Sequence, residues 1–371
     1  MDNRFKDQVI SAYLNGSVSE AALHSINQLS KELCGTALYG ELAGEALHSK
    51  KKEMTENPPE ETVAAPSQEY CPKISFIVPT HNRVKLLPRC IDSIMSQSYP
   101  NKEIIIIDDC SSDGTKEYVQ EHYSQVDCIV YLRNETNLGP GGTRQKAYCA
   151  STGEFLVFVD DDDFYFEPSF AKTAIRIFGE HDNVGMVCAN SLIYDVVGKR
   201  MSFYPLTFCG ELSGKEFFMG FRTKYRKPNS TFPTVFRRAV LDKADFKNMW
   251  MMNDTSIYLR SACYCDVYMI SQWTGCYLVH DSNISKSLPH KFILENLDEK
   301  KNIYAIARES FGINMDSWYS AQIMDTVSYY LKSEKISFAH FASVIKWILL
   351  NGEAVKKELI NKAVRIQYRK K

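Results

Sequence analysis

The segment EFLVFVDDDD, residues Glu154 to Asp163, decides how the rest of the sequence is interpreted. It begins as a continuous apolar run, which is the pattern of a strand buried on both faces of a parallel sheet. It ends in four consecutive aspartates, whose charges repel one another. Ligands of parallel α/β sheets gather at the carboxyl ends of the strands, and carboxylates bind hard divalent cations. We therefore predict a metal site here; a solvated acidic turn is the alternative.

An alternation of apolar runs and amphipathic segments surrounds this strand from about residue 73 onward. Short apolar runs that end in polar turns indicate strands, and apolar residues at helical spacing indicate helices. Such alternation favours right-handed crossovers and a mainly parallel sheet. The predicted strands are Ile74–Val78, Glu103–Ile107, Cys128–Leu132 and Phe155–Val159, and the predicted helices are Val84–Gln97, one that ends near Ser124, and Gly142–Ala150. The acids after the second strand, Asp108 and Asp109, are then expected at the same sheet edge as the four aspartates.

Four segments, in this order and spacing, resemble a family 2 glycosyltransferase. They are Ile74–Arg83 (ISFIVPTHNR), Glu103–Thr115 (EIIIIDDCSSDGT), Asn137–Ala147 (NLGPGGTRQKA) and Gly153–Pro168 (GEFLVFVDDDDFYFEP). The resemblance implies an α/β GT-A fold, the fold of nucleotide-diphospho-sugar transferases, with a mainly parallel central sheet and helices on both faces. It covers residues 72–190 well and only a few anchor residues up to position 290.

The resemblance places the uracil of a UDP-sugar against the turn after the first strand and the second acid after the next strand. The turn positions are Pro79, His81 and Asn82, and the acid is Asp109. A carboxylate can accept a hydrogen bond from the imide N–H of uracil. His81 replaces the aromatic residue that is commoner at its position. For Asp108 and Asp109 the structural alternative is capping of a helix N-terminus.

Arg144 matches a basic residue that family members use near the nucleotide. Its fixed charge suits a uracil edge or a diphosphate, and the alternative is a plain surface arginine. The preceding Gly-Pro-Gly-Gly stretch, Gly139–Gly142, permits close approach of the backbone.

The acidic run matches the Asp-X-Asp motif of the family. On this alignment Asp162 is a ligand of Mn²⁺ or Mg²⁺, while Asp160 or Asp161 faces the ribose or the water shell of the metal. Asp163 resembles an extra acid that often follows the motif, with capping of the next helix as its alternative role. Because four identical residues adjoin one another, the register stays ambiguous by one residue.

The second half of the chain supplies a candidate catalytic base. Family members have an acidic pair at the start of a helix, and this sequence has Asn253-Asp254 after four apolar residues. The resemblance therefore makes Asp254 the base, with a simple helix cap as the alternative. His280 follows the predicted strand Cys276–Val279 and corresponds to a histidine that can approach the metal or the diphosphate; a solvated loop residue is the alternative.

Together these residues predict a metal-dependent transfer of a sugar from a UDP-sugar to an acceptor hydroxyl, with inversion at the anomeric carbon. Bacterial surface polysaccharide assembly is the commonest setting of such a chain, and its saccharide acceptor is in some cases lipid-linked. Two alternatives remain. A sugar-nucleotide nucleotidyltransferase has a glycine-rich loop directly after the first strand, and a non-catalytic scaffold module has lost its metal or base residues. The sequence fixes neither the donor sugar nor the acceptor.

Composition agrees with a cytoplasmic enzyme. The 371-residue chain is 44% hydrophobic and 24% charged, and its net charge of −1 argues against a nucleic-acid partner. Its 11 cysteines have no repeated metal-ligand spacing, so reduced thiols are expected. The start of the chain lacks a signal-peptide pattern. No apolar run approaches the roughly 18 residues of a membrane span.

The sequence predicts four parts: an N-terminal helical extension (1–55), a linker (56–71), the catalytic domain (72–290) and a helical region (291–371). The extension could pack on the catalytic domain, pair with a second copy as a homo-oligomer, or bind another protein. The basic C-terminal end predicts peripheral contact with the inner face of the cell membrane. A helical cap with solvated lysines is the alternative.

Overall fold

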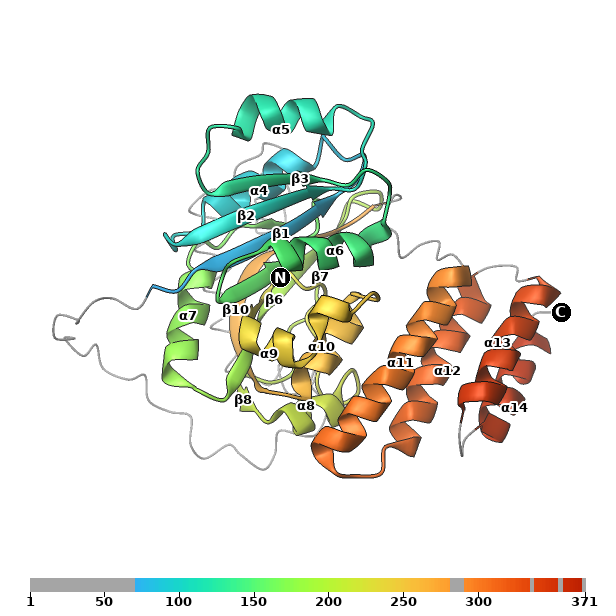
Figure 1. Ribbon diagram of the computed structural model, residues 1–371. Coiled ribbons are helices and arrows are strands. Elements are labelled where there is room, and N and C mark those ends of the chain that lie inside the picture. The colour runs from blue at the N-terminus through green and yellow to red at the C-terminus, as the bar shows by residue number, and fades with distance from the viewer. Residues whose placement is uncertain (1–70, 281–289, 334–336, 353–355, 369–371) are drawn as a thin grey trace.

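The computed structural model describes residues 71–280, 290–333, 337–352 and 356–368, which form a ten-stranded sheet with helices on both faces (Figure 1). The predicted N-terminal extension, and the linker apart from its last residue, lie outside the described residues. The main path of the sheet has the strand order β3-β2-β1-β4-β9-β6-β10-β5, and β7 and β8 pair with β6 and β10.

The first half of the domain follows the predicted alternation. Its four strands pair in parallel in the order β3-β2-β1-β4. The helix α6 begins three residues before the predicted start because its glycine-rich stretch is itself helical. The elements are β1 (Ile74–Thr80), α4 (Leu87–Met95), β2 (Lys102–Asp108), α5 (Thr115–Tyr123), β3 (Ile129–Arg133), α6 (Gly139–Ala150) and β4 (Phe155–Phe158).

The second half makes the sheet mixed. The strand β9 lies antiparallel between β4 and β6, whereas β10 runs parallel to β6. The elements are β5 (Phe164–Tyr165), α7 (Phe170–Glu180), β6 (Val184–Asp195), β7 (Arg200–Phe203), β8 (Gly210–Leu212), α8 (Gly214–Gly220), β9 (Thr234–Arg237), α9 (Arg238–Lys243), η2 (Phe246–Asn248), α10 (Asp254–Ala262) and β10 (Asp266–Val279). The predicted strand Cys276–Val279 is thus only the end of the 14-residue β10. The predicted parallel arrangement holds for β3-β2-β1-β4, and the second half of the sheet combines antiparallel pairs with the parallel pair β6-β10.

The central strands are buried on both faces, as their apolar runs predicted. In β1, Phe76 and Val78 belong to the core that also contains residues of α4, α5 and α7. Ile77 of the same strand points to the opposite core, which contains residues of α6, α8 and α10. Because successive side chains of a strand point to opposite faces, an unbroken apolar run is the pattern that a two-sided core requires.

Four helices follow the sheet domain: α11 (His290–Phe311), α12 (Asp316–Ser333), α13 (Phe338–Asn351) and α14 (Lys356–Tyr368). They lie side by side, with α11 and α12 between α10 and the last two helices (Figure 1). Their buried residues are continuous with the core on the α10 face, and the rings of Phe218 and Trp318 meet with centroids 4.6 Å apart. Within the described part of the chain, no helix is both long and apolar enough to cross a membrane.

A buried ion pair joins α10 to α11. Arg260 Nε and Nη2 donate to the two carboxylate oxygens of Glu299 at 2.5 and 2.8 Å. Arg260 Nη1 also donates to the carbonyl of Ala244 at 3.0 Å. Both charged side chains are at least 92% buried, so each depends on the other for its counter-charge.

We expect Arg260→Met to lower the free energy of unfolding by roughly 3–5 kcal/mol, because it leaves the Glu299 carboxylate buried without its partner. The exposed Arg176–Glu180 pair on α7 provides the matched control, since Arg176→Met should cost at most about 1 kcal/mol. Urea denaturation followed by circular dichroism measures both. Equal losses in the two variants would contradict the assignment of a structural role to the buried pair.

Candidate functional site

The acidic run lies where the sequence placed it, directly after the carboxyl end of β4. The strand β1 pairs with β4 through Ile77 and Phe158, and its last residue, Thr80, lies opposite Asp108 of β2. The ends of β1, β2 and β4 therefore form one edge of the sheet. This edge brings the residues after β1, the acids after β2 and the four aspartates together.

Arg83 holds two of the aspartates. Its Nη1 donates to Asp161 Oδ1 and to Asp162 Oδ2, each at 2.8 Å, and both carboxylates are at least 96% buried. Sequence reasoning missed Arg83, although it directly follows the His81-Asn82 turn within the first quoted motif. A fixed positive charge at this place offsets the mutual repulsion of the aspartates.

Arg144 is a buried residue of α6, only 6% exposed, so its alternative role as a surface arginine is wrong. Its Nη2 forms an ion pair with Asp160, and its Nη1 donates to the carbonyl of Met252 at 2.8 Å. The guanidinium thus connects the acidic run to the segment that precedes α10. The glycine-rich start of α6 permits this contact, because a Cβ on Gly141 would lie 2.3 Å from the carbonyl oxygen of Trp250.

Three carboxylates form the candidate metal cluster: Asp160, Asp162 and Asp163 each offer an oxygen within 4.8 Å of the other two. His280 Nε2 lies 2.8 Å from Asp162 Oδ2, which brings the predicted histidine to this cluster. Asp163 is fully buried and accepts a hydrogen bond from the amide of Leu278 at 3.2 Å. Its other oxygen has no hydrogen-bonding partner among the described residues. The structure therefore adds Asp163 to the candidate metal ligands. Asp163 does not cap the next helix, α7, which begins after Ser169.

Burial raises the pKa values of these carboxyl groups. The pKa of Asp161 rises to about 7, chiefly through desolvation, against which the charge of Arg83 acts. Desolvation and neighbouring aspartates also raise the pKa of Asp162, and that of Asp163 well above its ordinary value. A divalent cation would favour the ionised forms of these carboxyl groups. The donor set therefore fits a hard cation such as Mn²⁺ or Mg²⁺.

The turn after β1 is organised around Asp109. Its Oδ1 accepts from the amide of Leu138, and its Oδ2 accepts from the amide of Gly139, at 2.8 and 2.9 Å. His81 Nδ1 lies 2.8 Å from the Asp109 carbonyl, which can only accept, so Nδ1 carries a proton. Asn82 adopts a left-handed φ of 53°. A carboxylate oxygen has two acceptor sites, so Oδ2 retains capacity for a base imide.

Asp108 has a structural role at the end of β2. Its side chain accepts hydrogen bonds from the amide of Ser111 at 2.8 Å and from the hydroxyl of Tyr131 at 2.7 Å. Neither acid caps α5, whose first residue, Thr115, donates its amide proton to Asp113. The helix-cap alternative is therefore wrong for Asp108, whereas Asp109 accepts from the amides of Leu138 and Gly139 at the start of α6.

Asp254 is the first residue of α10 but not its cap. The Asn253 side chain accepts from the amide of Ser256 at 3.0 Å and so fills the capping position. This leaves the Asp254 carboxylate available, with a side chain 30% exposed. Its Oδ2 lies 3.7 Å from Nζ of Lys227, a residue that sequence reasoning missed because no motif contains it.

Tertiary folding places Asp254 within electrostatic reach of the acidic run. The buried Arg144 interacts with the charges of both Asp160 and Asp254. Burial raises the pKa of Tyr277 on β10, and the charges of Asp163 and Asp254 raise it further. The candidate metal cluster and the candidate base therefore belong to one site, with Arg144 and Tyr277 near both. Pro79, the remaining predicted residue, lies in β1 opposite Ile107.

Comparison with known proteins defines the class. Residues 75–250 match the family described as Glycosyl transferase family 2. This segment belongs to that family, and the chain has the GT-A fold, as the sequence resemblance predicted. The matched segment contains the acidic run and Arg144, and Asp254 lies just beyond it.

Two bacterial relatives match part of the chain. GalNAc(5)-diNAcBac-PP-undecaprenol beta-1,3-glucosyltransferase of Campylobacter jejuni is 33% identical over 51% of this chain, and the match spans 59% of that protein. The putative glycosyltransferase EpsH of Bacillus subtilis is 30% identical over 35% of this chain and 37% of its own length. The chain thus spans less than two thirds of either relative.

A solved structure supports the fold. Residues 1–349 of TarS from Staphylococcus aureus, in complex with UDP-GlcNAc, align over 80% of this chain and 92% of that chain. The TM-score is 0.52 at 19% sequence identity. At this identity the likeness concerns the fold alone.

The raised pKa of Asp161 predicts a pH effect on stability without metal. The folded protein binds the proton of the Asp161 carboxyl more tightly than the unfolded chain does. Protonation of Asp161 therefore adds its full contribution to the free energy of unfolding below about pH 4, and this contribution is lost as the pH rises to about 7. We expect the fall in unfolding free energy from pH 5 to pH 7.5, in chelator, to be smaller in Asp161→Asn than in the wild type, by about 2.5 kcal/mol. Urea denaturation at both pH values measures it. Parallel pH dependence in wild type and variant would contradict the shift.

Proposed function

We propose that this protein transfers a sugar from a UDP-sugar to an acceptor hydroxyl, with inversion at the anomeric carbon, in bacterial surface polysaccharide biosynthesis. One observation carries the proposal: the buried Arg144 pairs with Asp160 of the acidic run, donates to the carbonyl of Met252 two residues before Asp254, and interacts with the charge of Asp254. Family membership of residues 75–250 supports the reaction class. The UDP-GlcNAc complex of the TarS structure supports a UDP-sugar as donor.

In this proposal Asp254 is the catalytic base. It accepts the proton of the acceptor hydroxyl, whose oxygen forms the new bond to the anomeric carbon. The bond between that carbon and the diphosphate oxygen breaks, and UDP departs with the bonding electrons. Attack from the face opposite the leaving group accounts for inversion.

The other residues bind and orient the donor. We assign the uracil to Pro79, His81, Asn82 and Asp109 at the end of β1 and β2. The ribose and diphosphate side is assigned to the acidic run and Arg144.

A divalent cation, Mn²⁺ or Mg²⁺, would be held by Asp162 with Asp160, Asp163 and His280 nearby. When bound, it would stabilise the negative charge that develops on the diphosphate. Arg83 keeps Asp161 and Asp162 in place for this role.

Neither alternative function gains support from the site. Nucleotidyl transfer requires a glycine-rich loop directly after the first strand, and β1 is followed by His81, Asn82 and Arg83. A non-catalytic scaffold would have no need for a buried acidic cluster together with an accessible carboxylate at the start of α10.

A UDP-release screen across UDP-sugars with Mn²⁺ tests the reaction. We expect release with at least one donor, a loss of at least about 100-fold in Asp162→Ala, and a loss of about 100- to 10,000-fold in Asp254→Asn. Asp182→Asn, an exposed acid outside the site, should keep wild-type activity. The proposal fails if no donor releases UDP, or if Asp162→Ala retains full activity.

We also propose that the last two helices contact an anionic membrane face that presents a lipid-linked acceptor. The side chains of Phe338 and Leu350 on α13 are 85% and 73% exposed, and α14 begins with the exposed Lys356 and Lys357. Exposed apolar and basic side chains on adjacent helices suit an anionic interface. The Campylobacter relative, whose name includes a PP-undecaprenol compound, supports such an acceptor.

Flotation with phosphatidylglycerol vesicles tests this contact. The double variant Lys356→Glu and Lys357→Glu should lose roughly 2 kcal/mol of binding, about 30-fold in affinity, because each lysine near the surface contributes about 1 kcal/mol. Lys172→Glu with Lys199→Glu makes the same charge change on exposed residues elsewhere and should float like the wild type. Flotation that is equal in both double variants, or absent in the wild type, removes the basis of the proposal.

A further inference from the structure

Lys227 lies beside the proposed base in a defined geometry. It belongs to the segment between α8 and β9, and its side chain is 20% exposed. Its ammonium donates to the carbonyl of Pro228 at 2.9 Å and, more weakly, to that of Asn229 at 3.4 Å. Nζ lies 3.7 Å from Asp254 Oδ2. This is an ion-pair distance, and it is longer than a direct hydrogen bond.

The gap between the two charged groups fits one oxygen atom. Two atoms 3.7 Å apart can both contact a third atom that lies about 2.8 Å from each, which is an ordinary hydrogen-bond length. An ammonium has three donor protons, so one remains for such an oxygen after the two carbonyl contacts. Because Lys227 and Asp254 are both partly exposed, an oxygen can reach this position from solvent.

We propose that Lys227 is a further catalytic residue, whose ammonium donates a hydrogen bond to the oxygen of the attacking hydroxyl while Asp254 accepts the hydroxyl proton. The inference rests on the proposed function and adds to it the group that holds the nucleophile. A hydroxyl has one proton and two lone pairs. Asp254 takes the proton and Lys227 occupies one lone pair, so the second lone pair is directed to the anomeric carbon.

The step balances without any further reactant. The hydroxyl proton moves to Asp254, the hydroxyl oxygen bonds to the anomeric carbon, and UDP leaves with the electrons of the broken bond. Lys227 keeps its protons throughout. Burial lowers the pKa of Lys227, and the charge of Arg222 lowers it further, whereas the charge of Asp254 opposes both effects.

A purely structural Lys227 would balance the charge of Asp254 and support its own loop. Such a role predicts effects on stability or donor binding. The catalytic role predicts a slower transfer step at unchanged donor affinity and stability, because the hydrogen bond to the nucleophile is lost.

The experiment uses the full chain with Mn²⁺, the UDP-sugar that gives the fastest UDP release, and water as the acceptor. We expect Lys227→Met to lower kcat/KM about 10- to 100-fold, because it removes the hydrogen bond to the attacking oxygen. The Kd for UDP, measured by calorimetry, and the melting temperature should stay at their wild-type values. Lys227→Gln and Lys227→Arg, which each keep a hydrogen-bond donor, should recover part of the rate that Lys227→Met loses.

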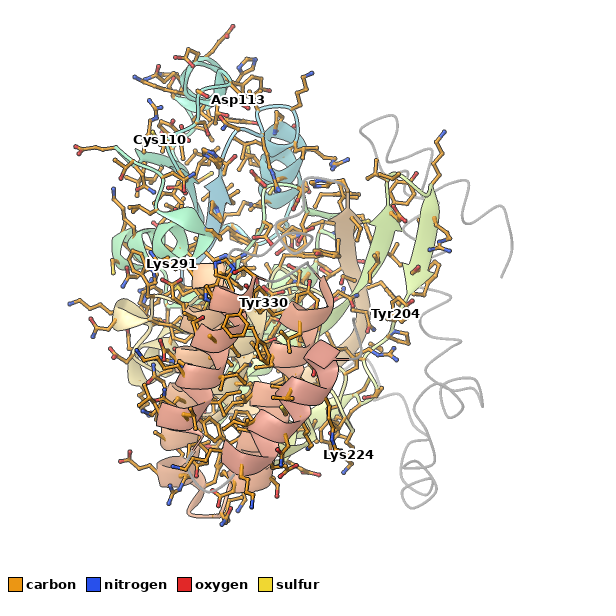
Figure 2. The ribbon with its side chains drawn as sticks, turned by 90° about the vertical axis from the view of Figure 1, so that its right-hand side faces the viewer. Cys110, Asp113, Tyr204, Lys224, Lys291 and Tyr330 are labelled. Atoms are coloured by element: carbon orange, nitrogen blue, oxygen red, sulfur yellow. The ribbon has the colours of Figure 1, made fainter. Side chains whose placement is uncertain are left out.

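Lys224→Met is the matched control, because it makes the same substitution three residues earlier in the same segment. The Lys224 side chain is 55% exposed, and its Nζ lies 3.5 Å from Glu216 Oε1. Lys224 is labelled in Figure 2. Lys224→Met should leave the rate unchanged. The inference is overturned if Lys227→Met keeps the wild-type rate, or if its lost activity accompanies a matching loss of UDP affinity or melting temperature. Absence of UDP release in the wild type would instead refute the proposed function itself.

Discussion

The site depends on one electrostatic constraint: four adjacent carboxylates are held at the end of a buried strand. Their repulsion and desolvation would oppose folding if they stayed ionised without partners. Arg83 forms ion pairs with Asp161 and Asp162, and Arg144 forms one with Asp160, which offsets this repulsion. Both arginines come from segments that follow other strands of the sheet. The interactions that offset the repulsion in the acidic run therefore also fix the relative positions of the turn after β1, α6 and the candidate metal cluster.

The constraint extends to the second half of the chain through Arg144. Its contact with the Met252 carbonyl positions the segment that leads into α10, and the buried Arg260–Glu299 pair fixes the other end of that helix. The helix that presents Asp254 is thus held at both ends. The C-terminal helices take part in this arrangement because Glu299 comes from α11. The C-terminal helical region therefore supports α10, the helix that carries the candidate base.

Much of the fold was predictable because its signals are local. Apolar runs in β1, β2 and β4 report burial on both faces, and the acids after them mark strand ends. The antiparallel β9 was not predicted, and the 14-residue β10 was predicted only at its end. The pairing of these strands depends on partners far away in the sequence. Polar residues within β10 also interrupt the apolar pattern that would have indicated its length.

The sequence by itself determined the family resemblance, the parallel first half of the sheet and the residue types of the candidate site, because these follow from short motifs and local periodicity. Only the tertiary structure decided which aspartate each arginine holds, that Asp163 joins the candidate cluster, and that Lys227 lies beside Asp254. The four aspartates have the same side chain, so the sequence does not distinguish them. Their burial and their partners differ, and those are set by strands and helices that meet only in the folded chain.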